Sequence, residues 1–228
     1  MENKEYIIIS LGGSLIIPDQ IDVNFLKDFK QLIIAQIEKG KKFVIVTGGG
    51  KLCRTYQNVA KEISNPTSED LDWIGIAALK LNAELLRVVF GEYANSMVVS
   101  NLSDNLSFER PIIIGSAYKP GQSTDWGAVI AAENIGSKIV INLSNTDYVY
   151  DSDPNKNPNA KKIEKMSWED YRNLIPKDWN PGLNSPFDPI ASKKAEELGI
   201  EVHFISGGNL ESVKNCIDNL PFIGTTIK

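Results

Sequence analysis

The sequence predicts an α/β protein built on a parallel sheet that helices cover. Two β-rich apolar runs, Tyr6–Leu11 and Phe43–Val46, lack the alternation of a half-exposed strand, and we interpret them as buried strands. A glycine cluster ends each run, and a helical pattern follows each cluster. This repeated order of strand, glycine loop and helix is typical of parallel strands joined by helical crossovers.

The remaining elements follow from local start and stop signals. Asp22 can cap a helix that runs to about Lys39 with its apolar residues on one stripe, and Gly40 ends it. The next expected elements are a helix near Leu52–Ile63, a turn at Asn65-Pro66, a helix from about Glu69 to Gly91, and strands at Ser96–Val99 and Pro111–Ile114. We then expect a helix from Asp125, a strand at Lys138–Leu143 and a structured loop or hairpin at Asn145–Asn159. A helix at Ser167–Leu174 and a turn-rich link at Pro176–Pro186 follow, and then a helix that Ser185 caps and that ends before Gly199. The final expected elements are a strand at Glu201–Ile205, a helix from Asn209 and a strand at Phe222–Ile227.

The composition limits the class of protein. The chain has 228 residues, of which 42% are hydrophobic, and no linker separates independent domains, so we expect one domain over residues 1–228 whose two lobes share a sheet. A net charge of −5 argues against nucleic acid or membrane partners, and no apolar stretch reaches the roughly 18 residues of a membrane helix. Two distant cysteines and the lack of a secretory signal predict a cytoplasmic protein.

The two glycine clusters indicate phosphate binding. Residues 12–14 (Gly-Gly-Ser) and 48–50 (Gly-Gly-Gly) let the backbone approach a ligand, and a helix start offers N–H groups and partial positive charge. A single Gly-Gly after a strand is more often only a tight turn, and neither cluster is a Walker or dinucleotide-binding loop. The pair, however, suits phosphoryl transfer between two bound molecules. Such chemistry must work without histidine, because the single one, His203, lies in an apolar strand pattern.

Further motifs extend over nearly the whole chain. They are Gly12-Gly13-Ser14-Leu15, Gly48-Gly49-Gly50-Lys51-Leu52-Cys53-Arg54, Asp72-Trp73-Ile74-Gly75-Ile76, Ser123-Thr124-Asp125, Asn145-Thr146-Asp147-Tyr148-Val149-Tyr150 with Asp153-Pro154, Asp188-Pro189-Ile190-Ala191-Ser192-Lys193, and Gly224-Thr225-Thr226-Ile227. Each motif alone is weak, but in this order they resemble the amino-acid-kinase superfamily and, within it, the archaeal-type uridylate (UMP) kinases. Arg54, Asp72 and the Ser-Thr-Asp motif favour a nucleoside monophosphate as the acceptor.

The resemblance implies a three-layer αβα sandwich on a mainly parallel central sheet, the carbamate-kinase-like or amino-acid-kinase fold. It places an acceptor (UMP) lobe at about residues 1–137 and an ATP lobe at 138–228. The implied reaction transfers the γ-phosphoryl group of ATP to UMP and gives UDP and ADP, a step of pyrimidine nucleotide biosynthesis. The implied partners are ATP with Mg²⁺, UMP and further copies of the chain, usually in a hexamer. We assign no metal ligands to the chain itself.

Individual roles come from the same resemblance. The residues with implied catalytic roles are Gly12, Gly13, Ser14, Asp188 and Lys193. Those implied to bind UMP are Gly48, Gly49, Gly50, Arg54, Asp72 and Thr124, and those implied to bind ATP are Gly13, Ser14, Asn145, Tyr150 and Asp153. The planar guanidinium of Arg54 matches a phosphate, whereas the carboxylate of Asp72 repels phosphate and suits ribose hydroxyls. Structural roles stay open for Asp72 and Asp188 as helix caps, for Tyr150 as a strand aromatic and for Asp153-Pro154 as a turn.

One expected cation is missing. Many superfamily members have a lysine two residues before the first Gly-Gly, where this chain has Ser10, and archaeal-type uridylate kinases also lack it. The candidates to neutralise the γ-phosphate are Lys51, Lys119 and Lys193, of which Lys193 matches the family motif best. Tyr148 stands where relatives have glycine and can reshape the ATP-side loop.

Two other functions stay open at this point. The first is a kinase of the same fold with another acceptor, such as isopentenyl phosphate or an amino-acid carboxylate, although Arg54 and Asp72 argue against it. The second is a catalytically silent relative that binds nucleotide or stores an oxyanion such as molybdate. The missing lysine and Tyr148 keep this second function open.

Overall fold

The protein is built on one seven-stranded sheet. The computed structural model describes residues 6–154, 156–176 and 185–228, and within them the strand order is β3-β2-β1-β4-β8-β9-β7. All neighbouring strands are parallel except β8 and β9, and β5 pairs with β6 in a separate antiparallel ribbon. The strands are β1 (Tyr6–Leu11), β2 (Lys42–Thr47), β3 (Ile112–Gly115), β4 (Ile139–Ser144), β5 (Val149–Tyr150), β6 (Lys162–Ile163), β7 (Lys165–Met166), β8 (Glu201–Ser206) and β9 (Thr225–Ile227).

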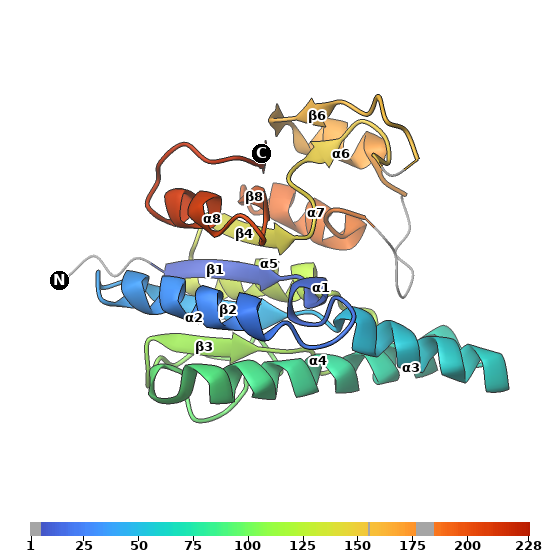
Figure 1. Ribbon diagram of the computed structural model, residues 1–228, viewed down its shortest axis with the longest axis horizontal. Helices are drawn as coiled ribbons and strands as arrows, with labels where there is room; N and C mark the ends of the chain where they lie inside the picture. The colour runs from blue at the N-terminus through green and yellow to red at the C-terminus, as the bar shows by residue number, and fades with distance from the viewer. Residues whose placement is uncertain (1–5, 155, 177–184) are drawn as a thin grey trace.

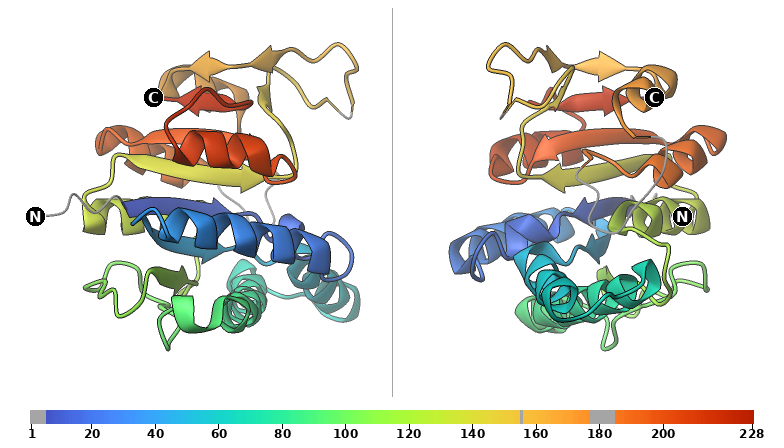
Figure 2. Two further views of the ribbon diagram at one scale, coloured as in Figure 1. Left: turned by 60° about the vertical axis from the view of Figure 1, so that its left-hand side comes forward. Right: turned by 90° about the vertical axis from the view of Figure 1, so that its right-hand side faces the viewer.

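Helices cover both faces of this sheet (Figures 1 and 2). The α-helices are α1 (Gly13–Ile16), α2 (Val23–Ile37), α3 (Gly50–Ile63), α4 (Ser68–Phe90), α5 (Thr124–Ile135), α6 (Trp168–Leu174), α7 (Pro189–Glu197) and α8 (Leu210–Ile217), and a 3₁₀ turn, η1, spans Gly91–Tyr93. Helices α2, α4 and α8 pack on one face, and α5, α6 and α7 pack on the other. In the part of the chain that is described, no helix is both long and apolar enough to span a bilayer.

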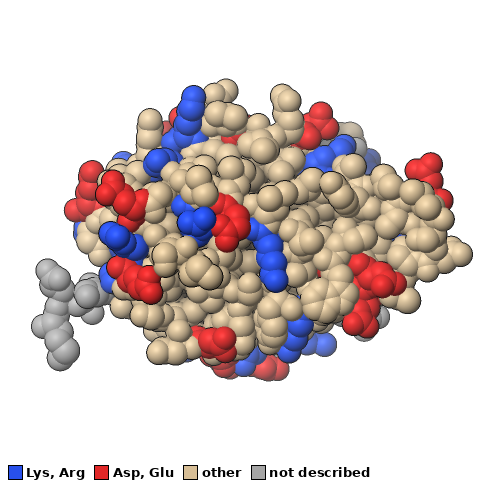
Figure 3. Space-filling view, turned by 90° about the horizontal axis from the view of Figure 1, so that it is seen from below, with Lys and Arg blue, Asp and Glu red and all other residues tan. Residues whose placement is uncertain are grey.

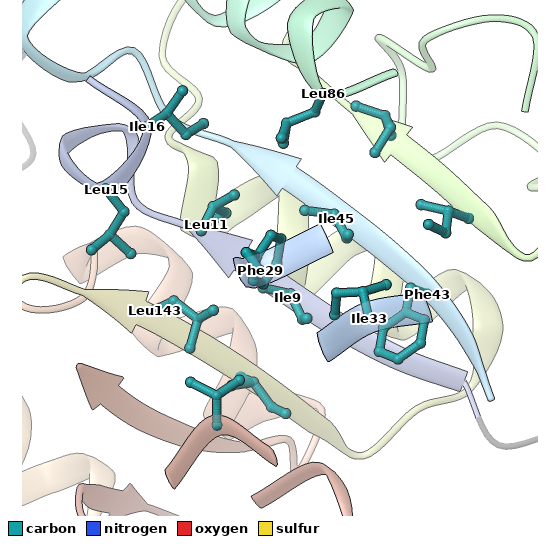
Figure 4. Close-up of a cluster of buried hydrophobic side chains, with 14 of the residues drawn as sticks. Ile9, Leu11, Leu15, Ile16, Phe29, Ile33, Phe43, Ile45, Leu86 and Leu143 are labelled. Atoms are coloured by element: carbon teal, nitrogen blue, oxygen red, sulfur yellow. The ribbon is translucent and has the colours of Figure 1, made fainter. Parts of the chain in front are cut away.

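Alternate residues of the central strand β1 enter two separate cores. Ile9 and Leu11 pack in the core beneath α2, where Phe29 is fully buried, as Figure 4 shows. Ile8 faces the opposite side and joins the core beneath α5 with Val129. Because successive side chains of a strand point to opposite faces, a strand that is apolar throughout requires a helical layer on each side. The predicted three-layer αβα sandwich on a mainly parallel sheet is therefore confirmed.

Local capping signals explain where several helices begin. The Asp22 carboxylate accepts a hydrogen bond of 2.9 Å from the backbone N–H of Phe25, as a helix N-cap does, so the prediction for α2 is confirmed. At the start of α4, Thr67 and Asp70 form a reciprocal capping box. Gly40, after α2, has a φ of +91°, a conformation that glycine adopts without strain.

Three predictions about elements need correction. Residues 96–99 do not form a strand, because Val99 makes only an isolated bridge to Gly115. Ser185 does not cap α7; the Asp188 carboxylate accepts a 2.7 Å hydrogen bond from the Ala191 N–H, and the proline after Asp188 fits the first helical position. The structured loop or hairpin expected at residues 145–159 extends further, because β5 pairs with β6 at residues 162–163. Most of the expected link at 176–186 lies outside the described residues.

Candidate active site

Both glycine clusters open into one cleft at the carboxyl ends of β1, β2 and β4. The cleft has a volume of about 650 Å³. Open parallel sheets bind ligands at this edge, outside the carboxyl ends of their strands. The implied site residues that line it are Gly12, Gly13, Ser14, Gly48, Gly49, Gly50, Arg54, Asp72, Thr124 and Asn145. The structure thus brings together every residue implied to bind UMP, three of those with implied catalytic roles and part of the ATP set.

The two glycine loops contact each other directly. A Cβ atom on Gly13 would lie 2.1 Å from the backbone nitrogen of Gly50, and a Cβ on Gly50 would lie 2.2 Å from the carbonyl oxygen of Gly13. Gly50 also has a φ of +63°, which disfavours any other residue. These two glycines are therefore needed for the packing of one loop on the other, in addition to any contact with a ligand.

Backbone hydrogen bonds fix both loops to the sheet. The N–H of Gly12 donates to the carbonyl of Leu143 and the N–H of Gly48 to the carbonyl of Leu11, each at 2.9 Å. The buried side chain of Asn82, from α4, donates to the Gly48 carbonyl at 2.7 Å. The N–H groups of Gly12 and Gly48 are therefore engaged within the protein and are not free to donate to a ligand.

Three helices bring polar side chains to the lining of the cleft. Arg54 is exposed in the first turns of α3, whose N-terminus begins at Gly50. Asp72, in the first turns of α4, accepts a 2.8 Å hydrogen bond from the N–H of Gly121, and partial burial raises the pKa of its carboxyl group. Thr124 is the first residue of α5. The cleft therefore contains a guanidinium, a carboxylate and a hydroxyl group. A phosphorylated sugar could bind such a set, with its phosphate at the cation and its hydroxyls at the carboxylate.

Asp125 lines the cleft, and the sequence analysis, which named it only as part of the Ser-Thr-Asp motif, gave it no role of its own. Its carboxylate accepts hydrogen bonds from the Ser10 hydroxyl (2.8 Å), the Asn142 amide (2.8 Å) and the backbone N–H of Asp188 (2.9 Å). Burial raises the pKa of Asp125 to about 7, the Ser10 hydrogen bond opposes this rise, and the nearby Asp188 charge adds to it. Asp125 therefore ties together β1, β4, α5 and the start of α7 beneath the cleft. A polar Asn142 inside the apolar strand β4 was the signal that could have pointed to it.

The other implied donor-side residues do not line the cleft. Tyr150 is in β5, where its ring packs edge-on against Tyr148 with centroids 6.4 Å apart, and Lys162 lies 4.8 Å from the centre of the Tyr148 ring. Asp153 is exposed in the loop that follows. The side chain of Asp188 is buried and caps α7, which is the structural role that the sequence had left open for it. Of the residues implied to bind ATP, those that line the cleft are Asn145 and, in the first glycine loop, Gly13 and Ser14.

The three candidate cations have different positions. Lys119 lines the cleft, on the loop between β3 and α5. Lys51 does not line it and lies 3.7 Å from the Asp19 carboxylate, whereas Lys193 is exposed on α7 and also does not line it. Among the residues described, Arg54 and Lys119 are the cations that line the cleft. His203 packs in β8, 3.2 Å from the Thr226 hydroxyl and away from the cleft, as expected.

Known proteins resemble this chain over almost its whole length. The model of the amino acid kinase family matches residues 5–206. A uridylate kinase of Methanospirillum hungatei is 32% identical over 97% of this chain and 94% of its own length, and one of Thermococcus sibiricus is 35% identical over 82% and 84%. The crystal structure of a uridylate kinase from Archaeoglobus fulgidus has a TM-score of 0.80 and 29% identity, covering 98% of this chain and all of its own. The chain belongs to the amino acid kinase family.

Proposed function

We propose that this chain is a UMP kinase, which transfers the γ-phosphoryl group of ATP to UMP and gives UDP and ADP. The observation that carries the proposal is the single cleft in which two glycine loops, Arg54 and Asp72 face one another. Uridylate kinases are similar to this chain over nearly its full length, which supports UMP as the acceptor.

The acceptor is proposed to bind on the side of α3 and α4. Arg54 and the loop of residues 48–50 would bind the UMP phosphate, because the α3 N-terminus and a guanidinium both favour an anion. Asp72 would accept hydrogen bonds from the ribose hydroxyls with the carboxylate oxygen that Gly121 leaves available. Thr124, at the start of α5, would contact the nucleotide from the opposite wall.

ATP is proposed to bind beyond the first glycine loop, over β4 and the hairpin of β5 and β6. Gly13 and Ser14 would contact the transferring phosphoryl group together with Gly12, and Asn145, Tyr150 and Asp153 would bind the rest of ATP. Transfer through a loose transition state needs positioning and charge neutralisation more than a base. In this proposal Asp188 acts by ordering the start of α7. Of the three candidates for the neutralising cation, Lys119 is favoured because it lines the cleft, whereas Lys51 and Lys193 do not.

Mg²⁺ would enter with ATP rather than through a preformed protein site. No group of three or more acidic, histidine or cysteine residues suited to a metal was found in the described ranges. Mg²⁺ commonly binds through substrate phosphates, waters and only one or two carboxylates, so an oxygen donor that lines the cleft, such as the Ser14 hydroxyl, fits it. When bound, the ion would neutralise charge on the transferring phosphoryl group.

We further propose that the chain acts as a homo-oligomer in the cytoplasm. The face at the bottom of Figure 1, seen in Figure 3, carries scattered charges of both signs between broad uncharged areas. Exposed apolar side chains on α3 and α4 are Tyr56, Val59, Ile63, Trp73, Leu81 and Val88. Such surfaces are typical of protein interfaces. The two cysteines, Cys53 and Cys216, are unpaired thiols, which fits a reducing compartment.

A coupled assay of ADP release tests the proposed reaction. Purified protein with ATP and Mg²⁺ is offered UMP, CMP, acetylglutamate or isopentenyl phosphate in parallel. We expect the highest kcat/KM with UMP. Turnover only with another acceptor would assign the chain to a different kinase activity, and tight ATP binding without any turnover would assign it to the catalytically silent relatives.

A further inference from the structure

The C-terminal strand β9 lies beside the hairpin of β5 and β6, at the top of Figures 1 and 2. It contains Thr225, from the terminal Gly-Thr-Thr-Ile motif, to which the function proposed above gives no role. We propose that the Thr225 hydroxyl fixes the base of the hairpin and thereby positions Tyr150 for ATP. This inference rests on the proposed ATP site. It makes Thr225 a positioning residue, which acts through the hairpin and does not contact a substrate.

One hydroxyl holds both strands of the hairpin. The Oγ1 atom of Thr225 accepts a 2.8 Å hydrogen bond from the Val149 N–H in β5 and donates a 2.5 Å hydrogen bond to the Ile163 carbonyl in β6. Val149 and Ile163 are direct partners in the antiparallel ribbon. A hydroxyl can make both bonds because it has one O–H donor and two lone pairs. The two strands are therefore joined to β9 at a single residue pair.

The main sheet sets the position of Thr225. Its side chain is fully buried, and it stands opposite Phe204 of β8. The preceding residue, Gly224, lies so close to β8 that a Cβ atom would be 2.4 Å from the Phe204 carbonyl oxygen. The following residue, Thr226, donates its N–H to the Glu164 carbonyl at 2.9 Å. The hydroxyl thus reaches the hairpin from a strand whose neighbours hold it on both sides.

The base of the hairpin is buried, whereas the part beyond it is exposed. Val149 packs in the core beneath α5, so its N–H needs a partner inside the protein. Tyr150 is the next residue and pairs with Lys162, and residues 151–154 after it are exposed. The direction in which the exposed part leaves the sheet, and with it the place of the Tyr150 ring, therefore depends on the bonds at Val149.

A loosened base is expected to weaken ATP binding in a predictable way. Without the hydroxyl, the hairpin would adopt several positions relative to the sheet, of which only some present Tyr150 to ATP. The apparent affinity of a ligand falls in proportion to the fraction of protein in the binding-competent state. The acceptor side would not be affected, because its glycine loops are held by separate hydrogen bonds to β1 and β4.

Thr225→Val tests this role in the full-length protein, because valine has the same branched shape as threonine but no hydroxyl. We expect the KM for ATP to rise about tenfold and the KM for UMP to change less than about twofold. Thr225→Ser keeps the hydroxyl and should restore the KM for ATP. Thr226→Val is the matched control, since its hydroxyl lies 3.2 Å from His203 and away from the hairpin; it should leave both KM values unchanged.

Calorimetry with two ligands separates the hairpin from the glycine loops. In this proposal a non-hydrolysable ATP analogue reaches the hairpin, whereas inorganic tripolyphosphate has no adenosine and reaches only the phosphate-binding groups. Thr225→Val should weaken binding of the ATP analogue about tenfold and leave binding of tripolyphosphate unchanged. Equal weakening of both ligands, no weakening of either, or failure of Thr225→Ser to restore binding would overturn the inference. So would absence of ATP-analogue binding to the wild-type protein.

The outcomes distinguish this inference from the proposed function. Binding of the ATP analogue that depends on Thr225, without turnover of UMP, would contradict the proposed function and leave the role of Thr225 intact. Turnover of UMP with the same KM for ATP in all variants would overturn the role of Thr225 alone. If Thr225→Val does not fold, hydrogen exchange of the wild-type protein gives the test. The Val149 amide should exchange slowly without any ligand, and rapid exchange would overturn the inference.

Discussion

The two glycine loops and the hairpin that follows β4 are built in opposite ways. Each loop is short, leaves a central strand directly, and is held by hydrogen bonds to backbone carbonyls of neighbouring strands. The hairpin between residues 145 and 163 is long and pairs over only two residues in each strand, and most of its described residues are exposed. The glycine loops are therefore fixed at the cleft before any substrate binds. The hairpin leaves Tyr150 and Asp153 outside the lining of the cleft.

This difference indicates that the sheet positions the two glycine loops, proposed to hold the transferring phosphoryl group and the acceptor phosphate, more firmly than the hairpin proposed to hold the rest of ATP. Parallel neighbours β1 and β2 must end at the same edge, so their loops meet whatever the substrate is. A long loop has no such constraint, and its residues reach a ligand only if the loop adapts to it. We therefore infer that the acceptor side and the site of phosphoryl transfer are preformed, and that the site for the rest of ATP is completed when ATP binds.

We expect the largest loss of stability and of turnover from a substitution at the contact between the two glycine loops. Gly50→Ala would place a methyl group 2.2 Å from the Gly13 carbonyl at a φ of +63°, so it should destabilise the protein by at least about 3 kcal/mol and abolish turnover. Gly40→Ala is the control, because its φ is +91° but no atom lies within 4 Å of the added Cβ; it should cost about 1–2 kcal/mol and leave turnover unchanged. Urea unfolding and ADP release measure both. Equal losses in the two variants would show that the loop contact is unimportant.

The next largest effect that we expect is the contribution of Asp125 to the pH dependence of the free energy of unfolding. Because burial raises its pKa to about 7 in the folded protein, the folded state binds more protons than the unfolded chain between pH 4 and 7. The stability from this group is thus present at low pH and is lost as the pH rises, by on the order of 2 kcal/mol between pH 5 and 7. Asp125→Asn should remove this slope in urea unfolding. An unchanged slope would mean that the carboxyl group is already ionised at pH 5.

Asp125 also shows what the sequence could and could not predict. The strands β1, β2, β4 and β8 follow from apolar runs, and the cap of α2 follows from Asp22, since these are local signals. The contact of Asp125 with Ser10 joins residues 115 positions apart, so no local pattern reports it.

Two errors have related physical causes. The segment 96–99 has strand-like composition, but Val99 meets β3 only through an isolated bridge to Gly115, so packing and not propensity decided its structure. Ser185 and Asp188 are both good capping residues, and the proline that follows Asp188 favours the later start. The error at Ser185 could therefore have been avoided from the sequence, because the proline is a local signal, whereas the error at residues 96–99 could not.

A smaller and more selective effect is expected from the cleft-lining arginine of α3. Arg54→Ala should raise the KM for UMP roughly 30-fold, equivalent to about 2 kcal/mol, because charge-assisted hydrogen bonds to the phosphate are lost. The KM for ATP should change less than about twofold. Lys51→Ala is the matched control, since Lys51 lies on the same helix but does not line the cleft. Equal increases in both KM values would refute the acceptor role of Arg54.

Hydrogen–deuterium exchange of the wild-type protein with one substrate at a time tests the division between the two sides most directly. We expect UMP alone to slow exchange in residues 48–57 and 118–125, and a non-hydrolysable ATP analogue alone to slow exchange in residues 144–153. The larger change should occur with the ATP analogue, because the hairpin is the exposed part that ATP completes. Protection of the same segments by both ligands, or of residues 48–57 by the ATP analogue alone, would contradict the proposed division.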